Sequence, residues 1–370
     1  YWFKFLKQKV YSQVYLTLSN IVGFLVSPYF LFFNLFRKKY SLKKIMVRKI
    51  LILEYHRIGD VLIILPIIKS IRRGYPKSKI VLICCEESYS LIDHFNVVDK
   101  IIPVKMPWTD WDFSLKKWTK LIDLIKELRL EKADLAIDFK GDFRNNWFLW
   151  NLRAKVSMGF SPTGGSYFLT DSFKFNHKLH QRSRAEFIVS KAGCDVLEKI
   201  KKNKINVNGR IALHPGSSDY RRSWTEKKWI KLLYFLTKNF KVTVIKTPES
   251  YKLINIIKKN NYNVDIFSGD LVEFKMWLKD QILLIGVDSM AGHLAAELGV
   301  PTLSIFGSQN PDLTRPLGDF SVIIKPNKEC QHKKKHWRLC ANCMDEIDEE
   351  DVYNSVVKLI KIVKKSKNIK

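Results

Sequence analysis

After residue 49, short apolar runs alternate with amphipathic stretches along the chain. This alternation predicts the strands and helices of a parallel, doubly wound α/β sheet. Apolar residues recur every three or four positions between Ser114 and Leu130, which indicates a helix there. The predicted strands form two series: residues 50–54, 79–84, 100–103, 134–138 and 155–159, then residues 210–213, 242–245, 264–267, 282–285 and 302–306.

The two series are separated by a Lys- and Asn-rich stretch without periodicity at residues 193–208, where we expect a domain boundary. A chain of 370 residues also exceeds the usual size of a single hydrophobic core. We therefore expect an apolar segment with a basic collar, two Rossmann-like domains, and a closing helix with a basic tail. These regions cover residues 1–48, 49–195, 196–347 and 348–370.

The apolar segment has no charged residue from Val10 to Phe36 and is long enough to cross a bilayer. Polar residues and Pro28 interrupt it, so a span, a helix lying in the membrane interface and a helical hairpin bent at Ser27 and Pro28 all stay open. The alternative without a membrane is a pair of buried core helices. Three Lys precede the segment and seven basic residues follow it up to Lys49, which predicts a cytoplasmic location for the rest of the chain.

The formal net charge of +28 adds a surface potential that attracts anions. Nucleic acid, anionic lipid and phosphorylated sugars would all respond to such a field. We find no motif of a known nucleic-acid-binding module, and we therefore expect no nucleic-acid partner. The six cysteines are too few and too unevenly spaced for a disulfide framework, which favours a reducing compartment.

The first loop that follows a predicted strand reads Arg57-Ile58-Gly59-Asp60 and leads into an apolar helix. A carboxylate at a helix start caps free backbone N–H groups, or it serves as a general base that takes a proton from a hydroxyl nucleophile. Both roles can coexist in Asp60. Gly59 is expected to allow a tight turn and a close approach to a ligand.

Two further loops carry small and basic residues at predicted strand ends, where α/β folds bind their ligands. One runs from His214 through Ser217 and Ser218 to Arg221 and Arg222, and its backbone donors and guanidinium groups suit a diphosphate. The alternative is an ordinary exposed loop.

The other loop contains Asp288 and Ser289 and opens a helix that carries His293. A helix N-terminus favours a phosphate or a leaving diphosphate. A lone His is more often a packing or capping residue, so His293 by itself predicts little.

Taken in order, these segments resemble glycosyltransferase family 9, the ADP-heptose:lipopolysaccharide heptosyltransferases and their relatives. The resemblance spans about Lys49 to Lys361 and includes Phe306-Gly307 before two prolines. It implies a GT-B fold, with two Rossmann-like doubly wound domains and a cleft between them, preceded here by a membrane-associated helical segment. The first domain would bind the acceptor and the second the nucleotide sugar.

The resemblance also implies an inverting, metal-independent transfer without a cofactor. Asp60 matches the proposed catalytic base, and Arg57 and Gly59 support the acceptor or its loop. Positions that match donor-binding residues of the family are Ser217, Ser218, Arg221, Arg222, Glu249, Asp288, Ser289 and His293. The implied partners are a nucleotide-diphosphate sugar, for which ADP-heptose is the expectation, and a lipopolysaccharide core or other lipid-linked glycan. The implied place is the cytoplasmic face of the inner membrane, with a peripheral or single N-terminal anchor.

The sequence departs from the family pattern at Lys246-Thr247-Pro248, where Gly is usual, and at Met290. The N-terminal apolar segment is absent from the best-known members. A transferase that uses another nucleotide sugar, and a catalytically silent GT-B-like membrane-bound binding protein, are the alternative interpretations. The presence of Asp60 favours an enzyme.

A final cluster, which comprises Cys330, His332, His336, Cys340 and Cys343, has the spacing of a zinc site. Structural zinc usually holds together a small unit without its own core, whereas this segment joins a large domain to a closing helix. We therefore expect no bound metal and reduced thiols.

Overall fold

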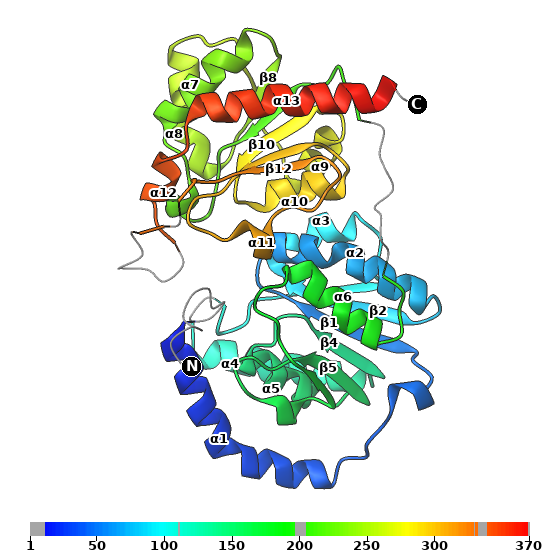
Figure 1. Cartoon of the computed structure of the whole chain (residues 1–370). Helices are drawn as coiled ribbons and strands as arrows, with labels where there is room; N and C mark the ends of the chain where they lie inside the picture. The colour runs from blue at the N-terminus through cyan, green and yellow to red at the C-terminus, as the bar shows by residue number, and fades with distance from the viewer. Residues whose placement is uncertain (1–11, 110–111, 197–204, 329, 332–338, 369–370) are drawn as a thin grey trace. The chain divides into compact units, whose positions relative to one another are not determined.

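The computed structural model describes residues 12–109, 112–196, 205–328, 330–331 and 339–368 (Figure 1). The chain divides into two compact units, Tyr1–Leu197 and Glu198–Lys370. Each contains one parallel six-stranded sheet.

The sheet of the first unit has the strand order β3-β2-β1-β4-β5-β6. Its strands are β1 (Lys49–Glu54), β2 (Lys79–Cys85), β3 (Lys100–Val104), β4 (Leu135–Asp138), β5 (Val156–Phe160) and β6 (Asp171–Phe173). The five strands expected from the sequence are confirmed to within a residue or two. The sequence analysis missed β6 because this three-residue edge strand is largely exposed and has no apolar run.

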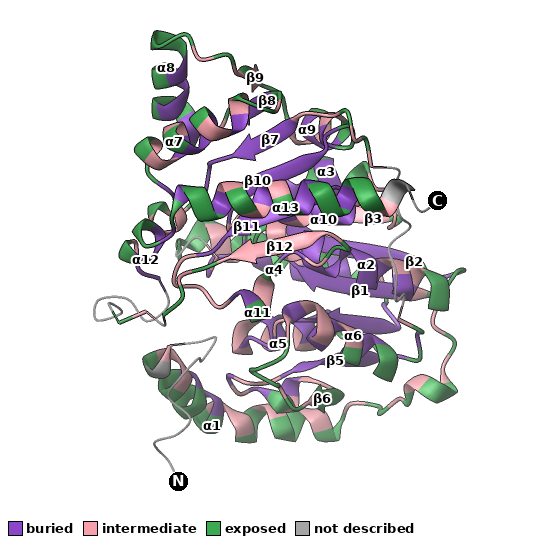
Figure 2. Ribbon diagram, turned by 45° about the horizontal axis from the view of Figure 1, so that its top comes forward, coloured by how far each residue is buried: buried purple, intermediate pink, exposed green. Residues whose placement is uncertain are grey.

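Helices cover this sheet and bury its central strands, which Figure 2 shows as buried. They are α2 (Ile58–Gly74), α3 (Tyr89–Asp93), α4 (Leu115–Leu130), α5 (Phe143–Leu152) and α6 (Gln181–Lys191), with short 3₁₀ turns η2 (Leu42–Lys44), η3 (Glu86–Ser88) and η4 (Ser166–Phe168). Because β1 is covered on both faces, Ile50, Leu51, Ile52 and Leu53 are all fully buried, which explains its continuous apolar sequence.

The N-terminal apolar segment forms one continuous helix, α1 (Gln13–Leu35), with Pro28 inside it. The hairpin considered at Ser27 and Pro28 is therefore not formed. Among the described residues, Val14–Leu35 is the one helix long and apolar enough to cross a membrane, and only 11 % of its most apolar window is buried. A buried core helix pair is thus also wrong, since a core helix would be mostly covered.

The sheet of the second unit has the order β12-β11-β10-β7-β8-β9. Its strands are β7 (Ile211–His214), β8 (Val242–Ile245), β9 (Asp265–Phe267), β10 (Leu283–Val287), β11 (Thr302–Ile305) and β12 (Ser321–Ile324). The five predicted strands are confirmed with small shifts at their ends. Strand β12, a half-buried edge strand, was not predicted, although Val322, Ile323 and Ile324 form a short apolar run.

The helical elements of this unit are η5 (Tyr220–Arg222), α7 (Glu226–Thr237), η6 (Pro248–Ser250), α8 (Tyr251–Lys259), α9 (Leu271–Leu278), α10 (Met290–Glu297), α11 (Pro311–Thr314), α12 (Asn342–Asp345) and α13 (Glu349–Asn368). Helix α13 packs against α7, and its residues Val352, Val356 and Leu359 join the core of the unit.

Both sheets begin in their middle and grow outward in two directions. In the first unit β1 lies between β2 and β4, and in the second β7 lies between β8 and β10. The chain thus passes from β1 to β2 on one side and later adds β4 on the other side, and in the second unit it adds β8 and then β10 in the same way. The carboxyl ends of these central strands are where doubly wound folds bind ligands.

Candidate active site

Asp60 lies in the first turn of α2, directly after the carboxyl end of β1. The N-cap position belongs to Arg57, which is exposed and makes no side-chain cap bond. The Asp60 carboxylate instead accepts a hydrogen bond from Lys140 Nζ at 2.7 Å from Oδ1. Gly59 lies in the same helical turn without a positive φ, and the chain does turn tightly there, since the Asp60 N–H donates to the Arg57 carbonyl at 3.0 Å.

Lys140 follows β4, the strand next to β1, and links two carboxylates. Its Nζ lies 3.6 Å from Oε2 of Glu54, which is buried at the end of β1. The other oxygen of Glu54, Oε1, lies 3.1 Å from Nδ1 of His56. Burial by itself would raise the pKa of Asp60, but the charges of Lys140 and His56 reverse this effect and hold that pKa well below its usual range. Asp60 is therefore ionised at neutral pH.

Asp138 forms a second, fully buried carboxyl group at the end of β4. It accepts hydrogen bonds from the Gly141 N–H at 2.6 Å and from Asn145 Nδ2 at 2.8 Å. Asn145 in turn accepts a bond from the Tyr55 hydroxyl. Burial raises the pKa of Asp138 to about 6, and the hydrogen bonds from Gly141 and Asn145 oppose this increase.

The sequence analysis missed Glu54, His56 and Lys140, which form a charged group with Asp60, and the buried carboxyl group of Asp138 at the end of the neighbouring strand. A signal was present, because Glu54 and Asp138 each end an apolar strand run. What was missing was the strand order, since β1 and β4 are neighbours in the sheet but far apart in the sequence.

In the second unit, the loop after β7 carries Ser217, which is buried, and Ser218, which is exposed. His214 ends β7, and burial lowers its pKa to about 4, so it is neutral at pH 7. Its Nδ1 lies 3.4 Å from Ser289 Oγ, at the start of α10. This contact joins the loop after β7 to the loop after β10.

The two arginines of η5 have different partners. Arg221 is held in a two-pronged pair by Asp219, with its Nε 2.9 Å from Oδ1 and its Nη2 2.6 Å from Oδ2. Arg222 Nη1 instead lies 3.3 Å from Asp288 Oδ2, at the end of β10, and both side chains are largely buried. The Nε of Arg222 is buried without a hydrogen-bond partner among the described residues. Arg222 is therefore the arginine that faces the helix start at Asp288.

Glu249 lies in η6, which follows β8, and it is close to the loop after β7. A Cβ added to Gly216 would lie 2.4 Å from Thr247 Oγ1 and 3.1 Å from Glu249 Oε2, so the loops after β7 and β8 are in close contact. Only a residue without a side chain fits at position 216.

Helix α10 begins at Met290, and its N-cap residue Ser289 makes no side-chain cap bond. His293 lies in the first turn and is half-buried. The first N–H groups of α10 thus have no cap from Ser289, next to the Arg222–Asp288 pair. Such a helix start combines free donors with a positive dipole end, which suits an anionic group.

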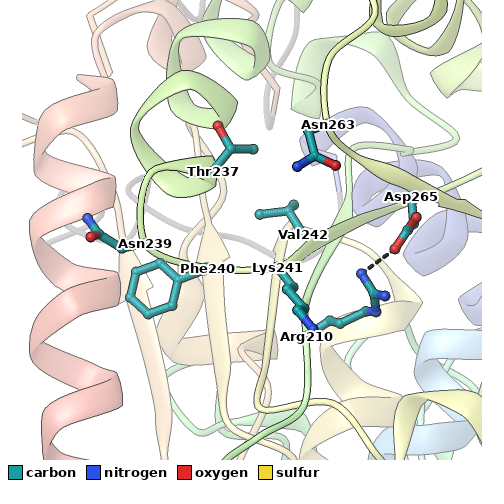
Figure 3. A pocket seen from close by; sticks show the side chains of 8 residues that line it. All are labelled: Arg210, Thr237, Asn239, Phe240, Lys241, Val242, Asn263 and Asp265. Atoms are coloured by element: carbon teal, nitrogen blue, oxygen red, sulfur yellow. Dashed lines mark ion pairs between the residues drawn. The ribbon is translucent and has the colours of Figure 1, made fainter.

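The structure therefore brings Ser217, Arg222, Glu249, Asp288 and Ser289 to the carboxyl edge of one sheet. It ties Arg221 to Asp219 and places Asp60, Arg57 and Gly59 in the other unit. A cavity of about 270 Å³ at the opposite, amino edge is lined by Arg210, Lys241 and Asp265, among others, and Figure 3 shows the Arg210–Asp265 ion pair in its lining. Parallel sheets bind ligands at the carboxyl edge, and we assign this cavity no role in the reaction.

Comparison with known proteins identifies the family of the chain. Residues 121–342 match the family model described as glycosyltransferase family 9 (heptosyltransferase). "Lipopolysaccharide heptosyltransferase 3" of Escherichia coli is 22 % identical over 290 residues, which are 70 % of this chain and 83 % of that protein.

Solved structures share the fold. Escherichia coli heptosyltransferase WaaC with ADP superposes with a TM-score of 0.70 at 17 % identity, over 84 % of this chain and 99 % of that one. A family 9 glycosyl transferase from Veillonella parvula gives a TM-score of 0.68 at 16 % identity, over 85 % and 97 % of the two chains. Since the family model covers more than half of the sequence, this chain belongs to glycosyltransferase family 9 and is a glycosyltransferase.

Proposed function

We propose that the protein transfers a heptose from ADP-heptose, with inversion, to a lipopolysaccharide core or another lipid-linked glycan. Two sets of names support this proposal. The description of the matching family model names heptosyltransferases, and one relative is named lipopolysaccharide heptosyltransferase 3. Solved structures with the same fold are named as complexes with ADP and with ADP-2-deoxy-2-fluoro heptose.

The observation that carries the proposal is the Arg222–Asp288 pair beside the start of α10. A leaving diphosphate needs a fixed cation and backbone donors, since both stabilise the charge that grows on it as the glycosidic bond breaks. Arg222 supplies the cation and α10 the donors. In this proposal Asp288, Ser289 and His293 bind the donor sugar and phosphate, Ser217 and Ser218 bind phosphate oxygens, and Glu249 binds the ribose, as the family resemblance implies.

Asp60 is the proposed general base. The acceptor hydroxyl attacks the anomeric carbon, the bond from that carbon to the diphosphate oxygen breaks, and the hydroxyl proton passes to the Asp60 carboxylate. Lys140 keeps this carboxylate ionised and ready to accept a proton. The base needs this state before the reaction begins.

Transfer assays with defined donors test the proposal. ADP-, UDP-, GDP- and CMP-sugars are offered with a delipidated glycan acceptor, and the anomeric configuration of the product is read by NMR. The proposal predicts turnover with ADP-heptose and an inverted product. Turnover with another donor only would refute the donor assignment, and retention would refute the mechanism. Donor binding without transfer, equal in wild type and Asp60→Asn, would favour the catalytically silent alternative.

We further propose that α1 lies in the membrane interface instead of crossing it. Both ends of α1 are hydrogen-bonded to the first unit: the Tyr15 hydroxyl donates to Asp142 at 2.9 Å, and Asn34 Nδ2 donates to the Tyr167 carbonyl at 2.7 Å. Between them Phe30 packs edge-on against Trp150, with ring centroids 4.9 Å apart. A helix attached at both ends to an α/β domain cannot enter the bilayer without carrying polar groups with it.

The side of α1 that faces away from the first unit also supports a position in the membrane interface. It exposes large apolar side chains along its length, among them Val14, Leu18, Phe24, Leu25, Leu31, Phe32 and Leu35. Lys38, Lys39, Lys43 and Lys44 follow directly. An apolar face next to a basic cluster is the composition of a helix that lies on an anionic lipid surface. The basic cluster also favours the cytoplasmic leaflet of the inner membrane, where a lipid-linked acceptor would be close at hand.

A further inference from the structure

Three cysteine side chains converge in the second unit, in the segment between β12 and α13. The Sγ atoms of Cys330, Cys340 and Cys343 all lie within 4.8 Å of one another. In a tetrahedral thiolate site with metal–sulfur bonds of about 2.3 Å, two sulfurs are about 3.8 Å apart. The observed separations thus need only a small contraction around an ion. We propose that these three thiolates bind one structural metal ion of the zinc or iron type.

The identity of the side chains supports a metal over simple packing. No two of the three are joined in a disulfide, and Cys340 and Cys343 are buried while Cys330 is partly exposed. The other free cysteines, Cys84, Cys85 and Cys194, form no such group. Among the residues that the structure describes, this is the one cluster of three or more His, Cys, Asp or Glu side chains with ligand atoms close enough for a metal.

The backbone that carries two of the ligands is fixed by contacts that need no metal. The Cys340 N–H donates to Ser308 Oγ at 2.7 Å, in the loop after β11. The carbonyl of Met344, one residue after Cys343, accepts a bond from Trp224 Nε1 at 3.0 Å. A Cβ on Gly307 would lie 2.8 Å from Met344 Sδ, so this loop and α12 are in close contact. Two thiols with the two-residue spacing are therefore held in place before a metal arrives.

The position of the cluster indicates what a metal would stabilise. Between β12 and α13 the described residues contain one helix of four residues, α12, which is too short to be stable by itself. A metal bound by Cys330, Cys340 and Cys343 would cross-link Cys330 to α12 and its preceding residues. Helix α12 contacts η5, which carries Arg222, so the metal would support the proposed diphosphate site without touching it.

This inference reverses the expectation of free thiols from the sequence. That expectation rested on a segment that joins a large domain to a closing helix. The structure adds the proximity of the three sulfur atoms, which the spacing along the chain did not show. His332 and His336, considered as ligands from their spacing, lie outside the described residues. Three thiolates leave one tetrahedral position, which the proposal does not assign.

Elemental analysis of the full chain, purified without chelator, tests the proposal. We expect about one zinc or iron per chain in the wild type, and a loss of at least about tenfold in Cys340→Ser and Cys343→Ser. Cys194→Ser is the matched control, because Cys194 is a buried free cysteine of the first unit, and it should keep the metal. A wild type without metal, or equal metal content in all four proteins, would overturn the site.

Cobalt substitution gives an answer that does not depend on the folding of the variants. The wild type is stripped of metal under reducing conditions and titrated with Co²⁺. Tetrahedral thiolate coordination should produce a sulfur-to-cobalt charge-transfer band and strong visible absorption that saturate at one Co²⁺ per chain. Absence of both bands, or a disulfide between two of the three cysteines detected by mass spectrometry in freshly purified protein, would contradict the proposal.

Discussion

Lys140 Nζ lies 2.7 Å from Asp60 Oδ1, although the two residues are 80 positions apart in the sequence. Neighbouring strands create this contact, since Asp60 follows β1 and Lys140 follows β4. The pair keeps the proposed base ionised in a site where burial would otherwise favour its protonated form. The tertiary structure thus sets the protonation state of a residue that the sequence alone identified.

Replacing Lys140 by Gln should raise the pKa of Asp60, because the charge that lowers it is removed while its burial remains. Since transfer needs the ionised carboxylate, the acidic limb of the kcat/KM profile should move to higher pH. The profile is measured for wild type and variant with the same donor and acceptor. Lys155→Gln is the matched control, because Lys155 forms a 2.7 Å pair with Asp134 elsewhere in the unit. Superimposable profiles of Lys140→Gln and wild type would show that the pair does not control the base.

Replacing Asp60 by Asn should lower kcat by about 100-fold or more, the range expected for loss of a general base. Nucleotide affinity should stay within about twofold of wild type, because Asp60 belongs to the unit that does not carry the proposed diphosphate site. Single-turnover rates and calorimetric titration with ADP measure the two quantities. Asp123→Asn, an exposed carboxylate on α4, controls for loss of charge alone. Turnover within about threefold of wild type would exclude Asp60 as the base.

Arg222→Ala should weaken ADP binding and slow transfer together, by about tenfold or more in each, because the cation acts on the diphosphate before and during its departure. Arg222→Lys should restore part of the ADP affinity and part of the transfer rate, since it keeps the positive charge but loses the planar guanidinium that binds an anion through two N–H groups. Calorimetry and transfer assays measure the effects. Arg210→Ala is the matched control, because it removes a guanidinium from the amino edge of the same sheet, and it should change neither ADP affinity nor the transfer rate. Unchanged ADP affinity in Arg222→Ala would refute the diphosphate assignment.

Removal of residues 1–44 should release the protein from membranes and leave activity on a soluble, delipidated acceptor. A finer test replaces Leu25 and Phe32 by Asp, since both are exposed on α1, at 70 % and 57 %. We expect this variant to lose sedimentation with anionic phospholipid vesicles while its thermal midpoint stays unchanged. Phe30→Ala, on the side packed against Trp150, should instead lower the midpoint. Retained sedimentation of the truncated protein at high salt would identify another surface as the anchor.

The buried carboxyl group of Asp138 should make stability depend on pH. Its folded pKa of about 6 exceeds the ordinary value of 3.8, so the folded state binds the proton more tightly than the unfolded one. The resulting stability, of about 3 kcal/mol at most, is fully present below pH 3.8 and is lost as the pH rises through 6. The thermal midpoint of wild type relative to Asp138→Asn should therefore fall between pH 4 and pH 7. Parallel midpoint curves would show that Asp138 titrates normally.

The sequence by itself determined most of the elements and the family. Ten strands were predictable. The inner strands are covered on both faces and are therefore continuously apolar, and the edge strands β3 and β9 carry short apolar runs of their own. The helix at Leu115–Leu130 was predictable from its apolar spacing. The family was evident from motifs at strand ends, and the later comparisons confirmed it. The edge strand β6 was not predictable, since it is largely exposed and has no apolar run, whereas β12 carries the short apolar run Val322-Ile323-Ile324 and was missed.

Contacts between distant residues were decided only by the tertiary structure. Sheet order placed Lys140 between the carboxylates of Asp60 and Glu54, and it paired Arg222 with Asp288, 66 positions away. The helical hairpin allowed by Pro28 gave way to one helix that lies along the first unit, and spacing alone could not show that three cysteine sulfurs meet. The physical reason is the same in each case: local patterns record what each segment buries, whereas the partners of a polar side chain depend on which strands become neighbours.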